Sequence, residues 1–368
     1  MSGKIANRDF FFYVHASVTI FFMFGFGYLP PIYPLEQLGM QVLGIFIALL
    51  YAWTFIGFIW PSLLGFIALA LTGYDSLLNL LRAGFGNDIV LLCLFMFIFS
   101  EYLYRSGNVQ YLAEFLVSRK ICVGKPWMLT FMLFLGAYIL GSMVSLAGSI
   151  ILMWSIFYSV CEIVGYQKGD KWPAYVLVGI AYSCMLGFNI FPYKVVSALA
   201  LSTFTSFTGQ VVPFSTFVMI SLILSLCALM AFLLVGKFII RPDVSLLTTN
   251  VDFFSNMRRK KLTKEAKLGF ISIFVLLLMM ITPEYFSKYP LIHIFSQLKP
   301  LGCTIFVVLI LTTIQIDQKP VLDFVNYLRT GNIVWDVVIM LTITMPIAQA
   351  LSSEKTKIMD MISYYGQD

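Results

Sequence analysis

Long apolar runs separated by short polar segments follow one another along the whole chain. Several runs reach about 20 residues, the length that a helix needs to cross the hydrocarbon core of a bilayer. A transmembrane β-barrel would instead alternate apolar and polar residues over segments of about ten residues. The pattern therefore predicts an all-α membrane protein with many spans. The candidate spans cover residues 10–30, 38–59, 61–73, 88–104, 127–165, 173–205, 213–239, 267–282, 297–316 and 333–352.

Composition supports a membrane protein and argues against several functional classes. Of the 368 residues, 60% are hydrophobic and 11% are charged, whereas a soluble domain carries about 25% charged residues. The six cysteines are scattered without a CxxC pair, and the two histidines stand far apart. We therefore expect no disulfide framework, zinc site or resident cofactor. The net charge of +6 lies in a few loops and points to membrane orientation rather than to a nucleic-acid partner.

Lysine and arginine residues fall on one side of the predicted spans. They precede the first span, follow the runs that end near 104, 165 and 239, and precede the last span. The pattern is consistent if the N-terminus is cytoplasmic and residues 127–165 enter and leave on the same side. We therefore predict a multi-pass protein of the cell membrane with a cytoplasmic N-terminus. The basic run at 258–267 is expected to be a cytoplasmic loop near anionic lipid.

Residues 127–165 contain two apolar arms and a turn without charge. The turn reads Gly141-Ser142-Met143-Val144-Ser145-Leu146-Ala147-Gly148-Ser149. Two full spans and a re-entrant hairpin both return the chain to the cytoplasm, so both remain open. The small residues and hydroxyls favour the hairpin, because non-helical backbone at membrane depth is tolerated only where protein or a water-filled cavity covers it.

The next run, residues 173–205, is longer than one span requires and has a break at its centre. The break reads Gly187-Phe188-Asn189-Ile190-Phe191-Pro192-Tyr193-Lys194. Pro192 removes a backbone donor and clashes with the preceding turn of a helix. Asn189 and Lys194 would be unfavourable facing lipid. A discontinuous helix beside a hairpin is typical of the binding site of a secondary transporter.

One order of elements occurs twice along the chain. RAGFGNDI at 82–89 and RTGNIVWD at 329–336 each open a span, and amphipathic segments at 108–120 and 353–365 follow these spans. The predicted orientation places the two copies in opposite directions, as an inverted repeat requires. The second copy would need its hairpin and broken helix beyond Asp368, so a C-terminal truncation is expected. We predict scaffold spans at 1–125, a transport unit at 126–239, a basic loop at 240–266 and the start of a second repeat at 267–368.

The same features resemble a family of membrane carriers. Leu38-Gly39 at the start of the second span, Gly84-Phe85-Gly86-Asn87 before the fourth, the hairpin and the broken helix are similar to those of the divalent anion:sodium symporters. These are the dicarboxylate, citrate and sulfate carriers of the ion transporter superfamily. The resemblance implies a homodimer in which a mobile transport domain carries a small anion past a fixed scaffold in an elevator-like motion.

The resemblance also implies a location for the binding site. In that family a Ser-Asn-Thr signature at the hairpin tip binds sodium and a carboxylate or sulfate of the substrate. The matching positions here are Ser142, Met143 and Val144, so only the serine carries over, and sodium near Ser142 stays open as a coupling ion. The family's Gly-Thr-Pro-Pro-Asn-like break corresponds to residues 189–194, which retain one proline, Pro192.

Hydroxyl, amide and ammonium groups at the tip and the break are the candidate ligands for substrate and ions. The serine hydroxyls would bind an ion or satisfy neighbouring carbonyls, and Asn189 would contribute its amide or cap the helix break. The Lys194 ammonium would attract an anionic substrate or replace a sodium ion; the alternatives are an internal ion pair and a lysine that snorkels to the surface. Glu101 is expected at the membrane interface. The predicted site comprises Ser142, Met143, Val144, Ser145, Asn189, Pro192 and Lys194.

These features predict a secondary transporter of a small anion such as a dicarboxylate, citrate or sulfate. Its partners would be that anion, membrane lipid and a second copy of the chain. A non-transporting remnant is the first alternative, because half of the expected site would be missing. A membrane-embedded enzyme is the weaker alternative, because catalysis needs convergent histidine, aspartate or cysteine groups and the spans contain few of them.

Overall fold

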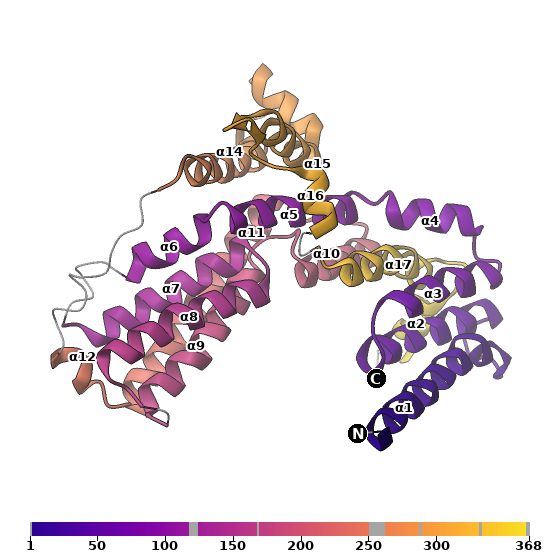
Figure 1. Ribbon diagram of the computed structural model, residues 1–368. Helices are drawn as coiled ribbons and strands as arrows, with labels where there is room; N and C mark the ends of the chain where they lie inside the picture. Colours follow the sequence, from indigo (N-terminus) through magenta and orange to yellow (C-terminus); the bar gives the residue numbers. More distant parts are fainter. Residues whose placement is uncertain are drawn as a thin grey trace. The chain divides into compact units, whose positions relative to one another are not determined.

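The computed structural model describes residues 2–117, 124–167, 169–249, 262–286, 289–330 and 333–365. Helices make up most of this described part (Figure 1). Contacts divide the chain into two compact units, each built from segments that are distant in sequence. The first unit comprises Met1–Leu94, Ala198–Val212 and Val334–Asp368, and the second comprises Phe95–Ser197 and Pro213–Ile333.

Two helices, α5 (Asp88–Arg105) and α10 (Val195–Thr208), contribute to both units. The first unit otherwise contains α1 (Ser2–Ile20), η1 (Phe21–Gly25), η2 (Phe26–Tyr28), α2 (Gln37–Phe55), α3 (Ile59–Leu71), α4 (Leu77–Phe85), α17 (Trp335–Ser352) and α18 (Ile358–Tyr365). The second contains α6 (Asn108–Val117), α7 (Pro126–Met143), α8 (Leu146–Val164), α9 (Lys171–Phe188), α11 (Phe214–Val235), η4 (Gly236–Ile240), α12 (Ser245–Thr249), α14 (Lys264–Phe286), α15 (Pro290–Thr313), β1 (Gln315–Ile316), β2 (Lys319–Pro320) and α16 (Phe324–Thr330).

The helices coincide with the predicted apolar runs. Helices α4 and α5 meet at a bend of 47°, and together they are long and apolar enough to form one broken span or a re-entrant loop. Lipid offers no partner to backbone groups, so spanning segments of this kind satisfy their hydrogen bonds within the helix. The predicted class, a helical membrane protein with several spans, is confirmed. In the described part of the chain, seven segments are long and apolar enough to cross a membrane: Phe10–Tyr28, Gln37–Phe55, Pro126–Met143, Phe214–Ile240, Lys264–Pro283, Ile292–Thr313 and Trp335–Ser352.

Helix α17 lies at the centre of the first unit. It packs against α2, α3 and α4, and its residues Ile343 and Ile347 join the buried core of that unit. A Cβ atom on Gly84 of α4 would clash with the backbone carbonyl of Thr342 in α17. Glycine therefore lets two helices from opposite ends of the chain approach at backbone distance, as small residues do between membrane helices.

The segment Gly84-Phe85-Gly86-Asn87 forms the bend between α4 and α5. The Gly86 N–H donates to the carbonyl of Arg82 at 2.9 Å, which closes the last turn of α4. The Asn87 side chain caps the next helix, because its Oδ1 accepts from the Ile89 N–H at 2.9 Å. Three of the four residues of this motif thus have a structural role: Gly84 permits the close approach to α17, Gly86 ends α4, and Asn87 caps α5.

Replacing Asn87 with alanine should lower the free energy of unfolding by about 1 kcal/mol, the usual cost of losing an N-cap acceptor. Asn87→Asp keeps an acceptor oxygen at the same position and should recover most of that loss. Thermal unfolding of the purified protein in detergent measures both effects. Equal stability of Asn87→Ala and the wild type would show that the cap contributes nothing.

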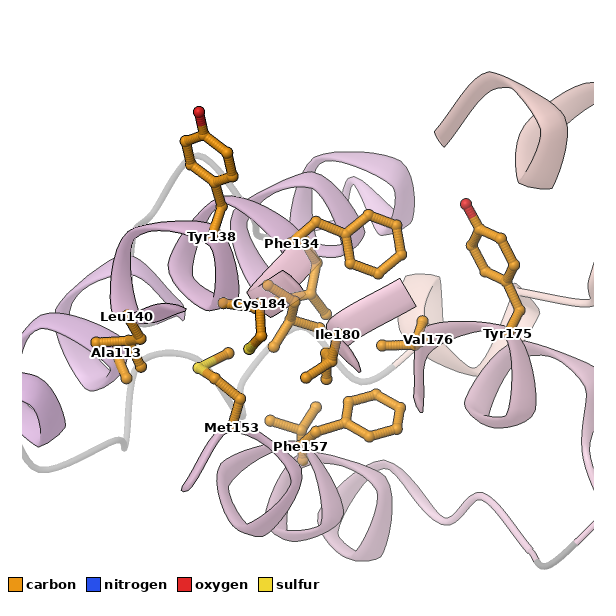
Figure 2. Close-up of a cluster of buried hydrophobic side chains, with 14 of the residues drawn as sticks. Ala113, Phe134, Tyr138, Leu140, Met153, Phe157, Tyr175, Val176, Ile180 and Cys184 are labelled. Atoms are coloured by element: carbon orange, nitrogen blue, oxygen red, sulfur yellow. The ribbon is translucent and has the colours of Figure 1, made fainter. Parts of the chain in front are cut away.

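Helices α7, α8 and α9 form the core of the second unit, and α11 packs against α7 and α9. Phe134, Met153, Phe157 and Ile180 belong to the buried apolar cluster of these helices (Figure 2). The buried Ser183 hydroxyl of α9 has no hydrogen-bond partner within the described part of the protein, but other polar groups in this core are paired. For example, the Tyr138 hydroxyl and the Ser225 hydroxyl lie 2.6 Å apart.

Two local features differ from the predicted pattern. Helix α15 begins at Pro290, before the predicted start at 297, and has a kink at Lys299, whose φ is 54°. The cause is Pro300, since a proline disfavours helical geometry in the residue before it. A small hairpin pairs β1 with β2. Its two turn residues, at 317 and 318, have positive φ, as the tight turns of two-residue hairpins require.

The repeated order of elements is visible as short, long and short helices. It occurs in α4, α5 and α6 and again in α16, α17 and α18. The long helix of each copy has 18 residues. The opposite membrane orientation of the copies and the predicted domain boundaries stay predictions. Of the basic run at 258–267, residues 258–261 lie outside the described residues, and α14 begins at Lys264.

Candidate functional site

The chain turns between α7 and α8 at the predicted hairpin tip. Helix α7 ends at Met143, and Val144 is extended, with φ −126° and ψ −170°. Ser145 caps α8, because its Oγ accepts from the Gly148 N–H at 3.3 Å. The Ser142 hydroxyl donates to the carbonyl of Ile139 at 2.7 Å. Ser142 therefore makes the carbonyl contact that was the alternative to ion binding, whereas Ser145 acts as a helix cap. The remaining lone pairs of both hydroxyls are compatible with either interpretation.

The predicted break in the next helix lies between α9, which ends at Phe188, and α10, which begins at Val195. Residues 191–194 form a turn in which the Lys194 N–H donates to the carbonyl of Phe191 at 3.1 Å. Pro192 occupies the second position of this turn, where its fixed φ is favourable. The sequence thus places the break correctly because proline favours a turn and disfavours a continuous helix.

Asn189 follows the last residue of α9, and one polar atom of its side chain is buried without a hydrogen-bond partner among the described residues. Its Nδ2 donates to the carbonyl of Met185 at 3.0 Å. Its backbone carbonyl accepts from the Ser197 hydroxyl at 3.0 Å. The side-chain oxygen Oδ1 is buried and has no hydrogen-bond partner within the protein. A buried acceptor in this position costs free energy until a donor reaches it, so the oxygen is available to a donor from outside the protein.

Lys194 connects the break to the hairpin tip. Its side chain is buried, with 4% of the residue exposed. The ammonium Nζ donates to the carbonyl of Val144 at 3.0 Å and lies 5.0 Å from the ring centroid of Phe188. The burial excludes a lysine that snorkels to the surface. This hydrogen bond directly connects the two predicted clusters, the tip and the break.

Glycines on α7 and α9 explain why tip and break meet. A Cβ atom on Gly141 would clash with the backbone carbonyl of Cys184, and one on Gly187 with that of Tyr138. The two helices therefore touch through their backbones near the end of α7, and this holds residues 189–194 beside the tip. Only residues without a side chain permit such an approach.

Glu101, which the sequence places near the membrane interface, is enclosed by protein, and its depth in the membrane stays a prediction. Glu101 is buried, with 7% exposed, and its Oε1 lies 2.6 Å from the Nε of Arg105. The Arg105 guanidinium also lies 5.0 Å from the ring centroid of Tyr327 in α16. A buried carboxylate is tolerated because the arginine one helical turn later offsets its charge. The spacing of four residues between Glu101 and Arg105 could have predicted their ion pair. No pattern in the sequence could have predicted the contact of Arg105 with Tyr327.

The described residues contain no group of three or more histidine, cysteine, aspartate or glutamate side chains placed to hold a metal ion. Among the seven predicted site residues, Lys194 alone carries a formal charge. The tip and the break therefore combine one buried positive charge, two hydroxyls and an amide oxygen with an apolar surround that includes Ile190 and Phe191. Sodium near Ser142 stays a prediction.

Comparison with known families shows the family to which the chain belongs. A family model described as "Citrate transporter" (CitMHS) matches residues 46–366, most of the chain. The chain belongs to this citrate transporter family. The family is part of the ion transporter superfamily, so the predicted superfamily is correct, while placement among the divalent anion:sodium symporters stays a prediction. A search of curated proteins gives no match. Several apolar helices and this family together make the chain a multi-pass membrane protein of an anion-transporting family.

Proposed function

We propose that this member of the citrate transporter family is a secondary carrier that moves citrate or a closely similar hydroxycarboxylate across the cell membrane. The observation that carries the proposal is the buried Lys194 ammonium, which joins the hairpin tip to the helix break at 3.0 Å from Val144. A carboxylate that leaves water needs positive charge and hydrogen-bond donors in its place. The ammonium and the first N–H groups of α8, beside Ser145, are groups of this kind.

Asn189 favours a substrate with a hydroxyl group. Its Oδ1 is buried without a hydrogen-bond partner, and the Met185 carbonyl fixes the amide so that the oxygen cannot exchange places with the donor nitrogen without losing a hydrogen bond. Citrate carries a hydroxyl that can donate to this oxygen, whereas a sulfate dianion has no donor. The site therefore suits a hydroxycarboxylate better than sulfate.

The remaining parts of the proposal follow from the family resemblance and the charge pattern. The carrier would be a homodimer with a cytoplasmic N-terminus, and the predicted transport unit, residues 126–239, would move relative to a fixed scaffold. Exposed apolar side chains such as Leu224 of α11 and Phe274 of α14 suit contact with lipid.

Uptake of radiolabelled citrate into proteoliposomes that contain the purified chain tests this proposal. Tricarballylate, which has the carboxylates of citrate without its hydroxyl, serves as the matched competitor. Wild-type protein should prefer citrate, and Asn189→Ala should reduce that preference by about fivefold, the value of one hydrogen bond of about 1 kcal/mol. Asn79→Ala, at an exposed position in α4, is the control and should leave the preference unchanged.

Two outcomes would count against the proposal. Equal competition by citrate and tricarballylate in the wild type would remove the role of Asn189 in recognising the hydroxyl. A folded protein that takes up no carboxylate under any ionic gradient would instead support the alternative of a non-transporting chain.

A further inference from the structure

The end of α7 presents a backbone suited to a cation. The last carbonyls of a helix have no partner inside the helix, and the helix dipole places partial negative charge there. Val144 directly follows α7, and its carbonyl accepts the hydrogen bond from the Lys194 ammonium. In ion-coupled transporters, unwound carbonyls and helix C-termini of this kind coordinate the coupling cation. The ammonium thus occupies a position whose chemistry suits a monovalent cation.

The surroundings of the ammonium are also those of a bound cation. The Nζ atom lies 5.0 Å from the ring centroid of Phe188 and 6.0 Å from that of Tyr193. The faces of aromatic rings attract cations, most strongly where water is excluded. Only 4% of Lys194 is exposed, so its charge is held by the protein rather than by solvent.

We propose that Lys194 is a positioning residue that acts as a tethered cation at the hairpin tip, so that the carrier needs no separate sodium ion there. This inference rests on the proposed transport function of the same site. A tethered ammonium is present at a high effective concentration and does not leave with the substrate. A sodium gradient therefore has no exchangeable ion to act on at this position.

The wild-type protein provides the first test. Citrate uptake into proteoliposomes should be the same with an inward sodium gradient as with choline in place of sodium. The melting temperature of the purified protein should likewise be the same in sodium chloride and in choline chloride of equal ionic strength. Sodium-dependent uptake, or a melting temperature that sodium raises, would overturn the inference.

Removal of the ammonium provides the second test. Lys194→Ala should lower the melting temperature and abolish uptake in choline, and sodium or methylammonium should restore part of both. Restoration by small cations is a readout that a merely structural lysine would not give. Lys171→Ala, at an exposed position at the start of α9, is the matched control and should behave as the wild type in every salt.

The outcomes separate this inference from the proposed function. If Lys194→Ala unfolds in sodium, methylammonium and choline alike, the same salts are tested on Lys194→Met, which keeps an apolar stem; the inference fails if small cations raise the melting temperature of neither variant. If the wild type takes up no citrate in any salt, the proposed function fails, and the melting temperatures of the wild type and Lys194→Ala still decide whether the lysine replaces a cation.

Discussion

Replacing Gly187 with alanine is expected to destabilise the second unit and to abolish citrate uptake. The single added methyl group would clash with the backbone of Tyr138, since the carbonyl oxygen and two further main-chain atoms of that residue lie where the Cβ would be placed. A backbone on a packed helix cannot rotate away as a flexible side chain can. The contact can be relieved only if α7 and α9 separate along their length.

Two opposing effects determine the size of this change. Alanine is the better helix former, which would stabilise α9 by about 1 kcal/mol relative to glycine. Overpacking of a well-packed core costs about 1–3 kcal/mol, and more where the backbone must shift. We therefore expect a net loss of about 2 kcal/mol, together with a displacement of Lys194 from Val144 that stops transport even in folded protein.

Size-exclusion chromatography, thermal unfolding and uptake measure the effect of Gly187→Ala. Gly25→Ala is the matched control, because a Cβ on Gly25 meets the ring of Phe21 at 3.4 Å, an ordinary van der Waals distance. This control should be neutral or slightly stabilising. Wild-type stability and uptake in Gly187→Ala would refute the close backbone contact between α7 and α9.

Replacing Arg105 with methionine is expected to lower the stability of the second unit by about 3 kcal/mol, near the low end of the range for a buried ion pair that loses one partner. The low end applies because Arg105 itself is partly exposed, at 34% of its side chain, whereas Glu101 is buried at 7%. The loss arises because the Glu101 carboxylate remains in the apolar interior without the guanidinium that offsets its charge. The contact of Arg105 with the ring of Tyr327 is lost as well.

A double-mutant cycle separates the charge from the packing. The combination of Glu101→Gln and Arg105→Met should be more stable than Arg105→Met alone, because no carboxylate is then left in the interior. Arg329→Met, at an exposed position of α16 in the same unit, should change the stability little. If the double variant is as unstable as Arg105→Met, the packing on Tyr327 rather than the charge is responsible.

The sequence pattern located the main features that depend on neighbours along the chain, although it missed the kink before Pro300 and the small hairpin of β1 and β2. Apolar runs located the helices, and the turn residues around Ser145 located the hairpin tip. Pro192 located the broken helix within a few residues. In each case the deciding physics is local, because a run of apolar residues, a helix cap or a proline acts on the backbone within a few positions.

Features that depend on distant segments could not be predicted in the same way. Lys194 was predicted to matter, but its hydrogen bond to Val144 depends on how α7 and α9 pack. The burial of Glu101 depends on Arg105 and on α16, far away in the sequence. The Asn189 oxygen without a partner became recognisable only when its surroundings were placed around it. A single sequence contains no direct information on such pairings.

The central position of α17 has a consequence for the order in which the protein is made. Its partners α2, α3 and α4 end by Phe85, and α17 begins at Trp335. At about 5–20 residues per second, a ribosome would deliver α17 on the order of ten to fifty seconds after α4. During that interval the faces of α2, α3 and α4 that pack against α17 would lie in the bilayer without this partner, where lipids or insertion factors can cover them.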